Sequence, residues 1–426
     1  MLDRSTPPPI KEVETLIFPE VDSCRLSNGI PLYIIDRGDQ ELSRIDILFS
    51  VGKVQERQPL TAKFTAAMLR EGAAGLSSAY IAEKLDYYGA TLQTLATQRN
   101  TYITLYSANR YFFDILPLLC KLVVSPDFPE EEFRTLKERN RQALSVDLMK
   151  VNILASRIFS EQLFGSENPY GKSEQLTDYD TLTTEHLREF HSRHYTAGQC
   201  RIVLSGRITP EMKAVVMETF AAVPSKSEFE KFLFPVIHSS SEHYRFVEKA
   251  GALQAGIRVG RLVVGRDHPD HHILHVLNTV LGGYFGSRLM SNIREEKGYT
   301  YGIQSSVVTY PDASYLVVQT QAATSYVKPL IDEIFNEFSR LRNELVEPDE
   351  LRMVRSYMTG EMLRLFDSPF SVAEVFVTLL ANGLDFSYYD ERFGVIRSFT
   401  AEQLQAAARC YLNKENFYIA VAGQEE

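Results

Sequence analysis

The 426-residue sequence is poor in cysteine and has no long hydrophobic run. Its four cysteines lie far apart, at Cys24, Cys120, Cys200 and Cys410. They form no C-x-x-C pair, which argues against a disulfide scaffold and against a thiolate zinc site. No stretch of about 18 apolar residues occurs, so no membrane span is expected. The Pro-rich N-terminus has no apolar signal segment, and we therefore expect a cytoplasmic protein with free thiols.

The sequence also has no basic cluster. Its formal net charge is −10, and Lys and Arg occur only as scattered pairs such as Lys137 and Arg139. Nucleic-acid binding requires clustered cations, so no nucleic-acid partner is expected. Apolar residues make up 44% and charged residues 23%, as in globular proteins. The length is too great for one ordinary core and favours two to three domains.

One pattern occurs twice, half a chain apart. A helical stretch ends near Tyr195 and is followed by the apolar run CRIVLSG, which ends at Gly206. A second helical stretch ends near Tyr411, and NFYIAVAG then ends at Gly423. A helix closing onto a buried strand at the end of each half predicts two homologous domains. The Pro- and Ser-rich segment 222–241 has the composition of a linker. We therefore predict one domain at 10–221 and another at 242–424.

Strand and helix signals are grouped in each half. Asn28-Gly29 between apolar runs predicts a hairpin with a tight primed turn. Further predicted strands cover 45–52, 91–97, 101–107, 253–262, 300–309 and 313–320. Helical spacing covers 60–70, 77–87, 109–122, 129–150, 152–164, 271–281 and 286–296, and long helices run from 325 to 396. Grouped strands and grouped helices predict an α+β fold in which each domain is an antiparallel-rich sheet packed with helices.

The segment 281–303 reads LGGYFGSRLMSNIREEKGYTYGI and is the most informative part of the sequence. Glycines precede a short amphipathic helix, and Gly298 ends it before a strand. Arg294 falls in the last turns of this helix and Tyr301 in the strand beyond. Both side chains could point into one cleft and offer a guanidinium and a phenol to a peptide carbonyl or carboxylate. On composition alone, a surface salt bridge for Arg294 and a core aromatic for Tyr301 would be the better interpretation, because one Arg and one Tyr at this spacing are common.

The stretch R-E-x-x-G-x-x-Y after Ser-Arg-Leu resembles the C-terminal-domain signature of the pitrilysin/insulinase-type zinc peptidases, which include mitochondrial processing peptidase. Asn168-Pro169-Tyr170-Gly171 is similar to the family's H-P-Y-G, with Asn for His. The half-length repeat is also a family feature, so the resemblance covers nearly the whole chain. It implies that Arg294 and Tyr301 bind the substrate backbone opposite a metal ion.

The zinc-binding motif of that family is missing. Its H-x-x-E-H places two His ligands on one helical face, with Glu as the general base beside them. Met68-Leu69 and Gly72 set the register of the matching helix, so the ligands fall on Lys63 and Ala67 and the base on Ala66. An ammonium and two methyl groups can neither ligate zinc nor accept a proton. The third ligand is a Glu on a later helix, where Asp147 is the sole carboxylate between 139 and 160, in an undetermined register.

The nine histidines offer no replacement site. None precedes residue 186. His186 and His191 are five residues apart, roughly 140° away from a shared helical face. His271 and His275 could chelate together, with His272 beside them, but no Glu stands at the general-base position. We interpret these three as surface histidines at the start of a helix. G-x-S-x-G, Walker and G-x-G-x-x-G motifs are also missing from the sequence.

We therefore expect a non-catalytic subunit with no cofactor of its own. It would form a heterodimer with an active, zinc-bearing homologue and orient a peptide substrate through Arg294 and Tyr301. The alternative is a catalytically silent, homodimeric peptide-binding or scaffold protein. A third possibility, an enzyme that uses an unrecognised site near Lys63, is weaker because a lone helical Lys is usually a surface residue. No peptidase activity is expected from the chain alone.

Overall fold

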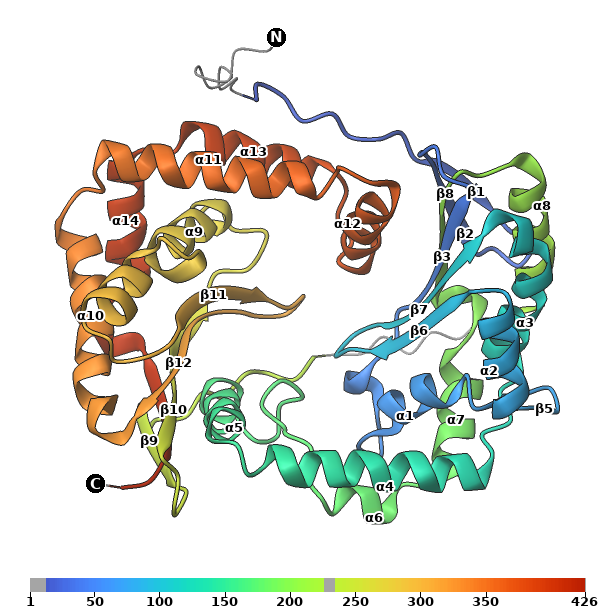
Figure 1. Cartoon of the computed structure of the whole chain (residues 1–426), viewed down its shortest axis with the longest axis horizontal. Coiled ribbons are helices and arrows are strands. Elements are labelled where there is room, and N and C mark those ends of the chain that lie inside the picture. Colours follow the sequence, from blue (N-terminus) through green and yellow to red (C-terminus); the bar gives the residue numbers. More distant parts are fainter. Residues whose placement is uncertain (1–12, 226–233, 426) are drawn as a thin grey trace, which may run out of the picture.

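The computed structural model describes residues 13–225 and 234–425. They form two large sheets, one built from residues 22–206 and the other from 244–423, with helices packed against both. Figure 1 shows one sheet toward each end of the molecule's long axis, the first at the right and the second at the left. The α+β architecture predicted from the sequence is confirmed.

The first sheet has six strands in the order β1-β2-β8-β3-β7-β6. Strand β8 is parallel to β2 and antiparallel to β3. The last strand of this sheet in the sequence therefore lies between two of the earliest strands. The central strand β3 is buried along nearly its whole length, including its polar residues Arg44 and Asp46, which pair with each other. The strands are β1 (Asp22–Arg25), β2 (Pro31–Asp36), β3 (Leu42–Phe49), β6 (Thr91–Ala96), β7 (Thr101–Ala108) and β8 (Cys200–Gly206). A small separate pair consists of β4 (Gly72–Ala73) and β5 (Leu76–Ser77).

The second sheet repeats this arrangement. Its order is β11-β12-β10-β13-β9, and its last strand, β13, is parallel to β9 and antiparallel to β10. Strand β13 therefore occupies the place that β8 has in the first sheet, as the repeat ending at Gly206 and Gly423 suggests. The strands are β9 (Tyr244–Glu248), β10 (Gln254–Val263), β11 (Ile303–Thr309), β12 (Ser314–Ala323) and β13 (Tyr418–Gly423).

The helices follow the predicted segments closely. The first half contains α1 (Thr61–Met68), α2 (Ser78–Tyr87), α3 (Phe112–Val124), α4 (Glu130–Asp147), α5 (Val151–Phe164), α6 (Asp178–Thr181), α7 (Thr184–His194) and α8 (Pro210–Thr219). The second half contains α9 (His271–Asn278), α10 (Val327–Asn343), α11 (Pro348–Arg364), α12 (Pro369–Ala381), α13 (Ser387–Ser398) and α14 (Ala401–Tyr411). Within the described ranges, none of the helices combines the length and hydrophobicity of a membrane span.

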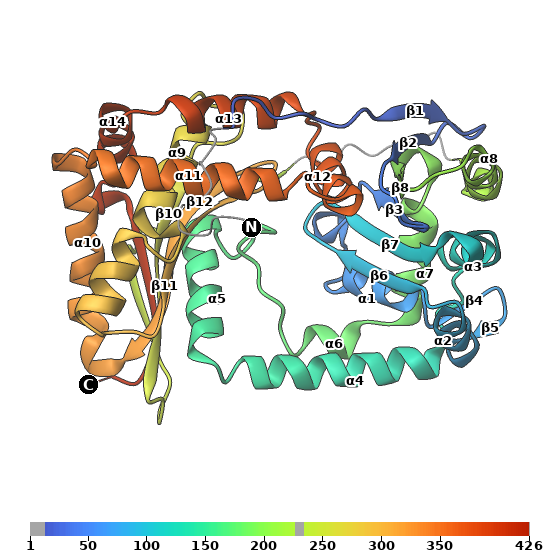
Figure 2. The same ribbon diagram turned by 45° about the horizontal axis from the view of Figure 1, so that its top comes forward.

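Each half places one helix on the other half's sheet. Helix α5 packs on β10 and β13 of the second sheet, and α12 packs on β8, β3 and β2 of the first. Figures 1 and 2 show α4 and α11 running along opposite sides of the molecule and leading to these exchanged helices. The apolar sequence of α12, PFSVAEVFVTLLA, suits a helix that is buried between two surfaces.

Glycines in β10 make room for α5. An ideal Cβ on Gly256 would lie 2.5 Å from the carbonyl oxygen of Val151. At Gly260 it would lie 2.5 Å from the ring of Phe159 and would also collide with the carbonyl oxygen of Leu316. The helix can therefore approach the sheet only because β10 presents bare backbone at these positions.

Polar contacts join the halves at the centre of the molecule. The turn between β6 and β7 meets the turn between β11 and β12, where Arg99 forms an ion pair with Asp312. The hydroxyl group of Tyr170 donates to Asp312 at 2.7 Å, and its ring stacks on Tyr310 at 4.2 Å between centroids. Tyr170 belongs to the Asn-Pro-Tyr-Gly segment, so this motif links the two halves.

The predicted domain limits stay a prediction. The sheets divide between Gly206 and Tyr244, but the exchanged helices cross that division. Residues 10–12 of the predicted first domain and 226–233 of the predicted linker 222–241 lie outside the described residues.

The hairpin at Asn28 is present, but the predicted primed turn is wrong. The N–H of Gly29 donates to the carbonyl of Leu26, and the N–H of Leu26 donates to Ile30, which leaves a three-residue loop. Gly29 has a φ of 86°, as this longer loop requires at its last residue. The Asn28 side chain donates to the carbonyls of Phe220 (2.9 Å) and Val223 (3.1 Å), so a distant contact fixes the loop.

We predict that Gly260→Ala destabilises the protein by about 1–3 kcal/mol, because the new methyl group forces α5 away from β10. Chemical denaturation of the purified chain measures the effect. Gly360→Ala in α11 is the matched control: outside its own helix, no heavy atom lies within 4 Å of the position that its new methyl group would take. This variant should be as stable as the wild type or slightly more stable. Equal stability of the two variants would contradict the close packing of α5.

Candidate functional site

The helix that corresponds to the zinc helix of the resembling family is α1. Ala66 is buried and Ala67 is half-buried on it, and neither has a side chain that could ligate a metal. The ammonium of Lys63 lies 3.0 Å from a carboxylate oxygen of Glu174. The hydroxyl group of Tyr179 donates to the same carboxylate. A hydrogen-bonded ion pair therefore lies at the position where the family has its metal ligands.

These residues do not fit zinc. Lys63 is engaged as a cation, so its nitrogen has no lone pair for a metal. Asp147, the candidate for the third ligand, is the last residue of α4 and forms an ion pair with Lys150 at 2.8 Å. Across residues 13–225 and 234–425, no cluster of three or more His, Cys, Asp or Glu side chains is suited to holding a metal ion. No catalytic step is assigned to a metal in this chain.

Glu56 holds the start of α1. Its carboxylate accepts the backbone N–H groups of Ala62 at 2.6 Å and Leu60 at 3.2 Å. Leu60 has a φ of 73°, in the left-handed region that leucine rarely adopts, so this helix start needs support from its surroundings. Burial raises the pKa of Glu56 from its ordinary value of 4.5 to about 7, although the backbone donors oppose the shift.

We predict that Glu56 makes the stability of the protein depend on pH. Because its pKa is raised by folding, its contribution is fully present below about pH 4.5 and is lost as the pH rises through about 7. Relative to Glu56→Gln, which keeps one carbonyl acceptor, the wild type should lose on the order of 1–3 kcal/mol between pH 5 and pH 8. Thermal unfolding of both proteins at the two pH values measures this change. The exposed Glu295→Gln is the control, and a gap between wild type and Glu56→Gln that stays constant with pH would contradict the prediction.

The segment that contains Arg294 is irregular. Residues Thr279–Gly283 and Met290–Glu296 are π-helical, and a bend that contains Gly286 lies between them. A Cβ on Gly282 would lie 2.7 Å from the hydroxyl group of Ser305, so this glycine allows the segment to lie against β11. Arg288 binds Glu350 of α11 through two nitrogens, at 2.9 and 2.8 Å, and this bidentate pair fixes the segment to α11.

Unlike Arg288, Arg294 does not fix the segment to another helix through an ion pair. Its guanidinium lies over the ring of Phe285, 4.8 Å from the ring centroid, and this ring is 64% exposed. Among the described residues, no carboxylate forms an ion pair with Arg294, in contrast to Arg288 six positions earlier. The Arg294 side chain therefore has hydrogen-bonding capacity left for a ligand.

Tyr301 does not lie in a strand, which corrects the expectation from the sequence. Strand β11 begins at Ile303. The hydroxyl group of Thr300 accepts the N–H of Gly302 at 3.1 Å and donates to the carbonyl of Gln321 at 2.6 Å, which bends the chain at this point. The bend turns Tyr301 outward, and its side chain is 93% exposed. A core position for this aromatic ring is excluded.

An aromatic surface beside Arg294 was missed at the sequence level. Tyr284 stacks on Tyr357 of α11 with 5.0 Å between ring centroids, and its hydroxyl group lies 3.6 Å from the sulfur of Met353. Together with the exposed Phe285, these side chains form an apolar border next to the guanidinium. The run Gly283-Tyr284-Phe285-Gly286 was its only signal in the sequence, because the α11 residues are distant in the chain.

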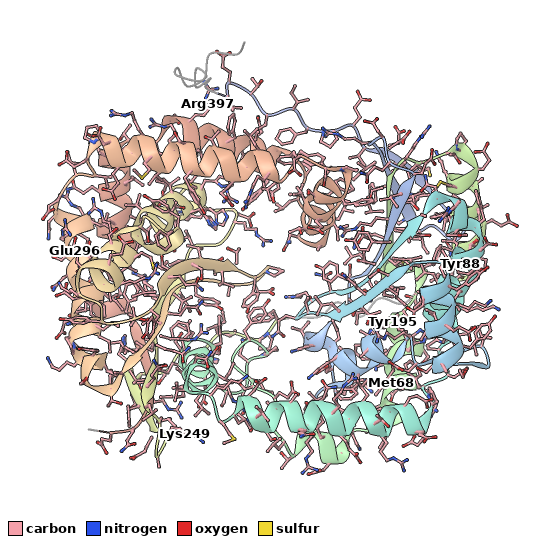
Figure 3. All side chains as sticks on the ribbon, viewed as in Figure 1. Met68, Tyr88, Tyr195, Lys249, Glu296 and Arg397 are labelled. Atoms are coloured by element: carbon pink, nitrogen blue, oxygen red, sulfur yellow. The ribbon has the colours of Figure 1, made fainter. Side chains whose placement is uncertain are left out.

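Helix α1 and the Arg294 segment lie far apart. Figure 3 labels Met68, at the end of α1, in one half of the molecule and Glu296, two residues after Arg294, at the opposite edge of the other half. The view places them apart along the longest axis of the chain. One copy of this chain therefore does not bring the two positions into a single site.

The histidines of α9 are not at the surface, and that interpretation is wrong. His271 and His272 are buried, and the rings of His271 and His275 lie 4.8 Å apart on one face of the helix. Burial lowers the pKa of His271 and of His272 to about 4, and nearby Arg392 adds to the effect. These side chains face α13 from α9, where neutral core residues fit. The His271 ring forms a hydrogen bond with the hydroxyl group of Tyr388 in α13 at 3.1 Å.

Comparisons with known proteins agree with this fold. The family described as "Peptidase M16 inactive domain" matches residues 181–358. The uncharacterized zinc protease YmxG of Bacillus subtilis is 20% identical over 347 residues, which cover 80% of this chain and 83% of the relative. The non-peptidase homolog YmxG of Helicobacter pylori is 24% identical over 299 residues, 67% of each chain. A crystal structure of a peptidase M16 inactive domain from Pseudomonas fluorescens superposes with a TM-score of 0.87 at 23% identity, covering 95% of this chain and 98% of that one.

The two sheets with exchanged helices give this chain the fold of the M16 proteins, and an ion pair lies at the position that matches the family's metal ligands. The chain is similar to M16 peptidase-type proteins: residues 181–358 match the family's inactive domain, and two of the relatives are themselves named an inactive metalloprotease and a non-peptidase homolog.

Proposed function

We propose that this chain is the non-catalytic subunit of a two-chain zinc peptidase and that it binds and orients the peptide substrate through Arg294 and Tyr301. The zinc ion and the general base would belong to a homologous partner chain. The observation that carries this proposal is that the fold leaves both side chains available: Arg294 contacts an exposed ring, and Tyr301 is 93% exposed.

The chemistry of the pair suits an extended peptide. A guanidinium offers several N–H donors in one plane, and a phenol can donate to or accept from a backbone group. Held in place by the Arg288–Glu350 pair, the segment would position a peptide carbonyl without taking part in proton transfer. The aromatic border formed by Tyr284, Phe285 and Tyr357 would contact substrate side chains.

The distance between α1 and the Arg294 segment supports a second chain. A peptide bound at Arg294 lies far from the position that matches the family's metal ligands in the same molecule (Figure 3). That position holds Lys63 and Glu174 instead of a metal site. Both points favour a partner whose zinc helix faces Arg294.

We predict that Arg294→Ala and Tyr301→Phe each lower the kcat/KM of the assembled pair by about 10-fold or more, because each removes a hydrogen bond to the bound peptide. The assay combines each purified variant with the zinc-bearing homologue from the same cell and follows cleavage of a quenched fluorescent peptide. Neither variant should change the thermal stability of the isolated chain by more than about 0.5 kcal/mol. Arg352→Ala in α11 is the matched control, since this exposed arginine lies outside the segment.

Unchanged activity of the pair with both variants would show that this Arg/Tyr pair does not act on substrate. If the homologue instead forms no complex, the alternative is a catalytically silent, homodimeric peptide-binding or scaffold protein. The Helicobacter pylori relative is itself called a non-peptidase homolog, which favours that alternative. Light scattering of the isolated chain and of the mixture distinguishes a homodimer from a heterodimer.

A further inference from the structure

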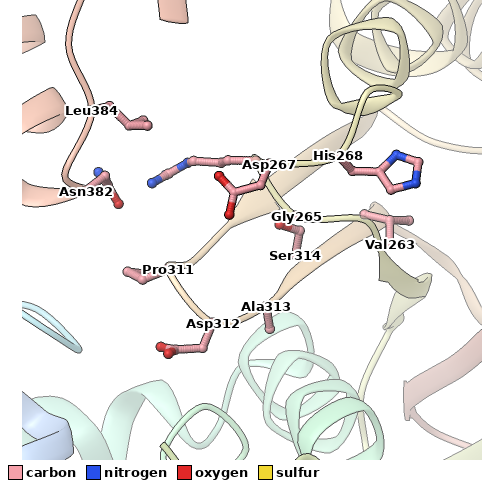
Figure 4. Close-up of a pocket in the computed structure, with 11 residues that line it drawn as sticks. Val263, Gly265, Asp267, His268, Pro311, Asp312, Ala313, Ser314, Asn382 and Leu384 are labelled. Atoms are coloured by element: carbon pink, nitrogen blue, oxygen red, sulfur yellow. The ribbon is translucent and has the colours of Figure 1, made fainter.

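A second candidate site lies away from Arg294, where three loops of the second half meet. It is a pocket with a volume of about 500 Å³, within the size range of small-ligand sites. The loop between β10 and α9 forms one wall, the turn between β11 and β12 a second, and the loop between α12 and α13 a third (Figure 4). The polar lining residues are Arg266, Asp267, His268, Asp312, Ser314 and Asn382.

Arg266 gives the pocket a cation that forms no ion pair within the described part of the chain, although the neighbouring Asp267 carboxylate acts on it electrostatically. Its guanidinium donates to the carbonyl oxygen of Thr309 at 3.1 Å. No carboxylate among the described residues forms an ion pair with it. Burial lowers the pKa of Arg266, which reflects the loss of water around a side chain that still carries its charge. A bound anion would compensate for this loss.

Ser314 gives the pocket a hydroxyl group without a partner. It is 1% exposed, yet it lines the pocket at the start of β12. Its Oγ atom makes no hydrogen bond within the described part of the chain. A buried hydroxyl group that stays unpaired costs free energy, and a ligand oxygen in the pocket would accept its hydrogen bond.

The two carboxylates of the pocket differ. Asp312 is neutralised by Arg99 and accepts the hydroxyl group of Tyr170. Asp267 has no ion pair among the described residues and remains available. The pocket therefore offers one unpaired cation, one unpaired anion and one unpaired hydroxyl group. This combination matches a ligand with a carboxylate and an ammonium group.

We propose that this pocket binds a short peptide with free termini, whose α-carboxylate pairs with Arg266 and accepts a hydrogen bond from Ser314. Asp267 pairs with the ammonium group of the same ligand. The inference rests on the proposed function only in taking a peptide as the ligand. The site is separate from Arg294 and Tyr301 and needs no partner chain.

The test is a ligand-observed NMR titration of the full isolated chain with trialanine. Trialanine should bind at least about 10-fold more tightly than its C-terminal amide, because the amide lacks the charge that pairs with Arg266. N-acetyl-trialanine should also bind more weakly, through loss of the contact with Asp267. Arg266→Gln and Ser314→Ala should each weaken trialanine binding. The matched control is Arg261→Gln, since Arg261 is also half-buried but donates to the carbonyls of Leu262 and Tyr411 outside the pocket.

Equal binding of the acid and the amide overturns the proposal, as does tighter binding of inorganic phosphate than of trialanine. If Arg266→Gln unfolds, as judged by thermal unfolding, Ser314→Ala decides in its place, and unchanged binding by that variant overturns the proposal. Arg352→Ala, which replaces an exposed arginine outside both sites, should bind trialanine as the wild type does. If trialanine does not bind this pocket, the outcome of the two-chain activity assay is unaffected. If the activity assay contradicts the proposed function, the outcome of the trialanine titration is unaffected.

Discussion

Helix α5 can lie on the second sheet only because β10 has glycine at positions 256 and 260. This contact and the packing of α12 on the first sheet exchange one helix between the halves. Neither half then buries its sheet without the other, so the two sheets are held in a fixed relation. A charge network strengthens the exchange: the buried Arg44 of β3 binds the buried Asp46 at 2.8 Å and the exposed Glu374 of α12 at 2.8 Å. Such a network is tolerated in a core because its members are paired.

The same constraint determines what the chain can do alone. With the halves held together by α5, α12 and the contact between Arg99 and Asp312, α1 and the Arg294 segment stay on opposite sides of the molecule. The pocket at Arg266 borders the central contact, since Asp312 lines it. A ligand in that pocket would therefore lie beside the junction of the halves, whereas one at Arg294 would not.

Much of the fold could be predicted from the sequence, because hydrophobic periodicity and turn residues report on local structure. The repeat that ends at Gly206 and Gly423 identified the matching strands β8 and β13. The errors all involve contacts between distant residues. Nothing near Tyr301 in the sequence indicated that Thr300 would bond to Gln321 and turn the ring outward. Nor did the polar character of His271 indicate that α13 would cover it. The absence of the H-x-x-E-H motif needed no tertiary information, since it is read directly from the sequence.

The position that matches the family's metal ligands is occupied by an ion pair and is not merely vacant. Lys63 now pairs with Glu174, and Tyr179 donates to the same carboxylate. Replacing Lys63, Ala66 and Ala67 by the family's His, Glu and His would remove the cation and leave Glu174 beside a new carboxylate. Breaking a partly buried pair by removing one partner costs more than never forming it. The chain would also still need a third ligand near Asp147, whose carboxylate is paired with Lys150. Metal binding at this position would therefore require several coupled changes. The half-buried Arg294 and the exposed Tyr301 form no ion pair in the described part of the chain.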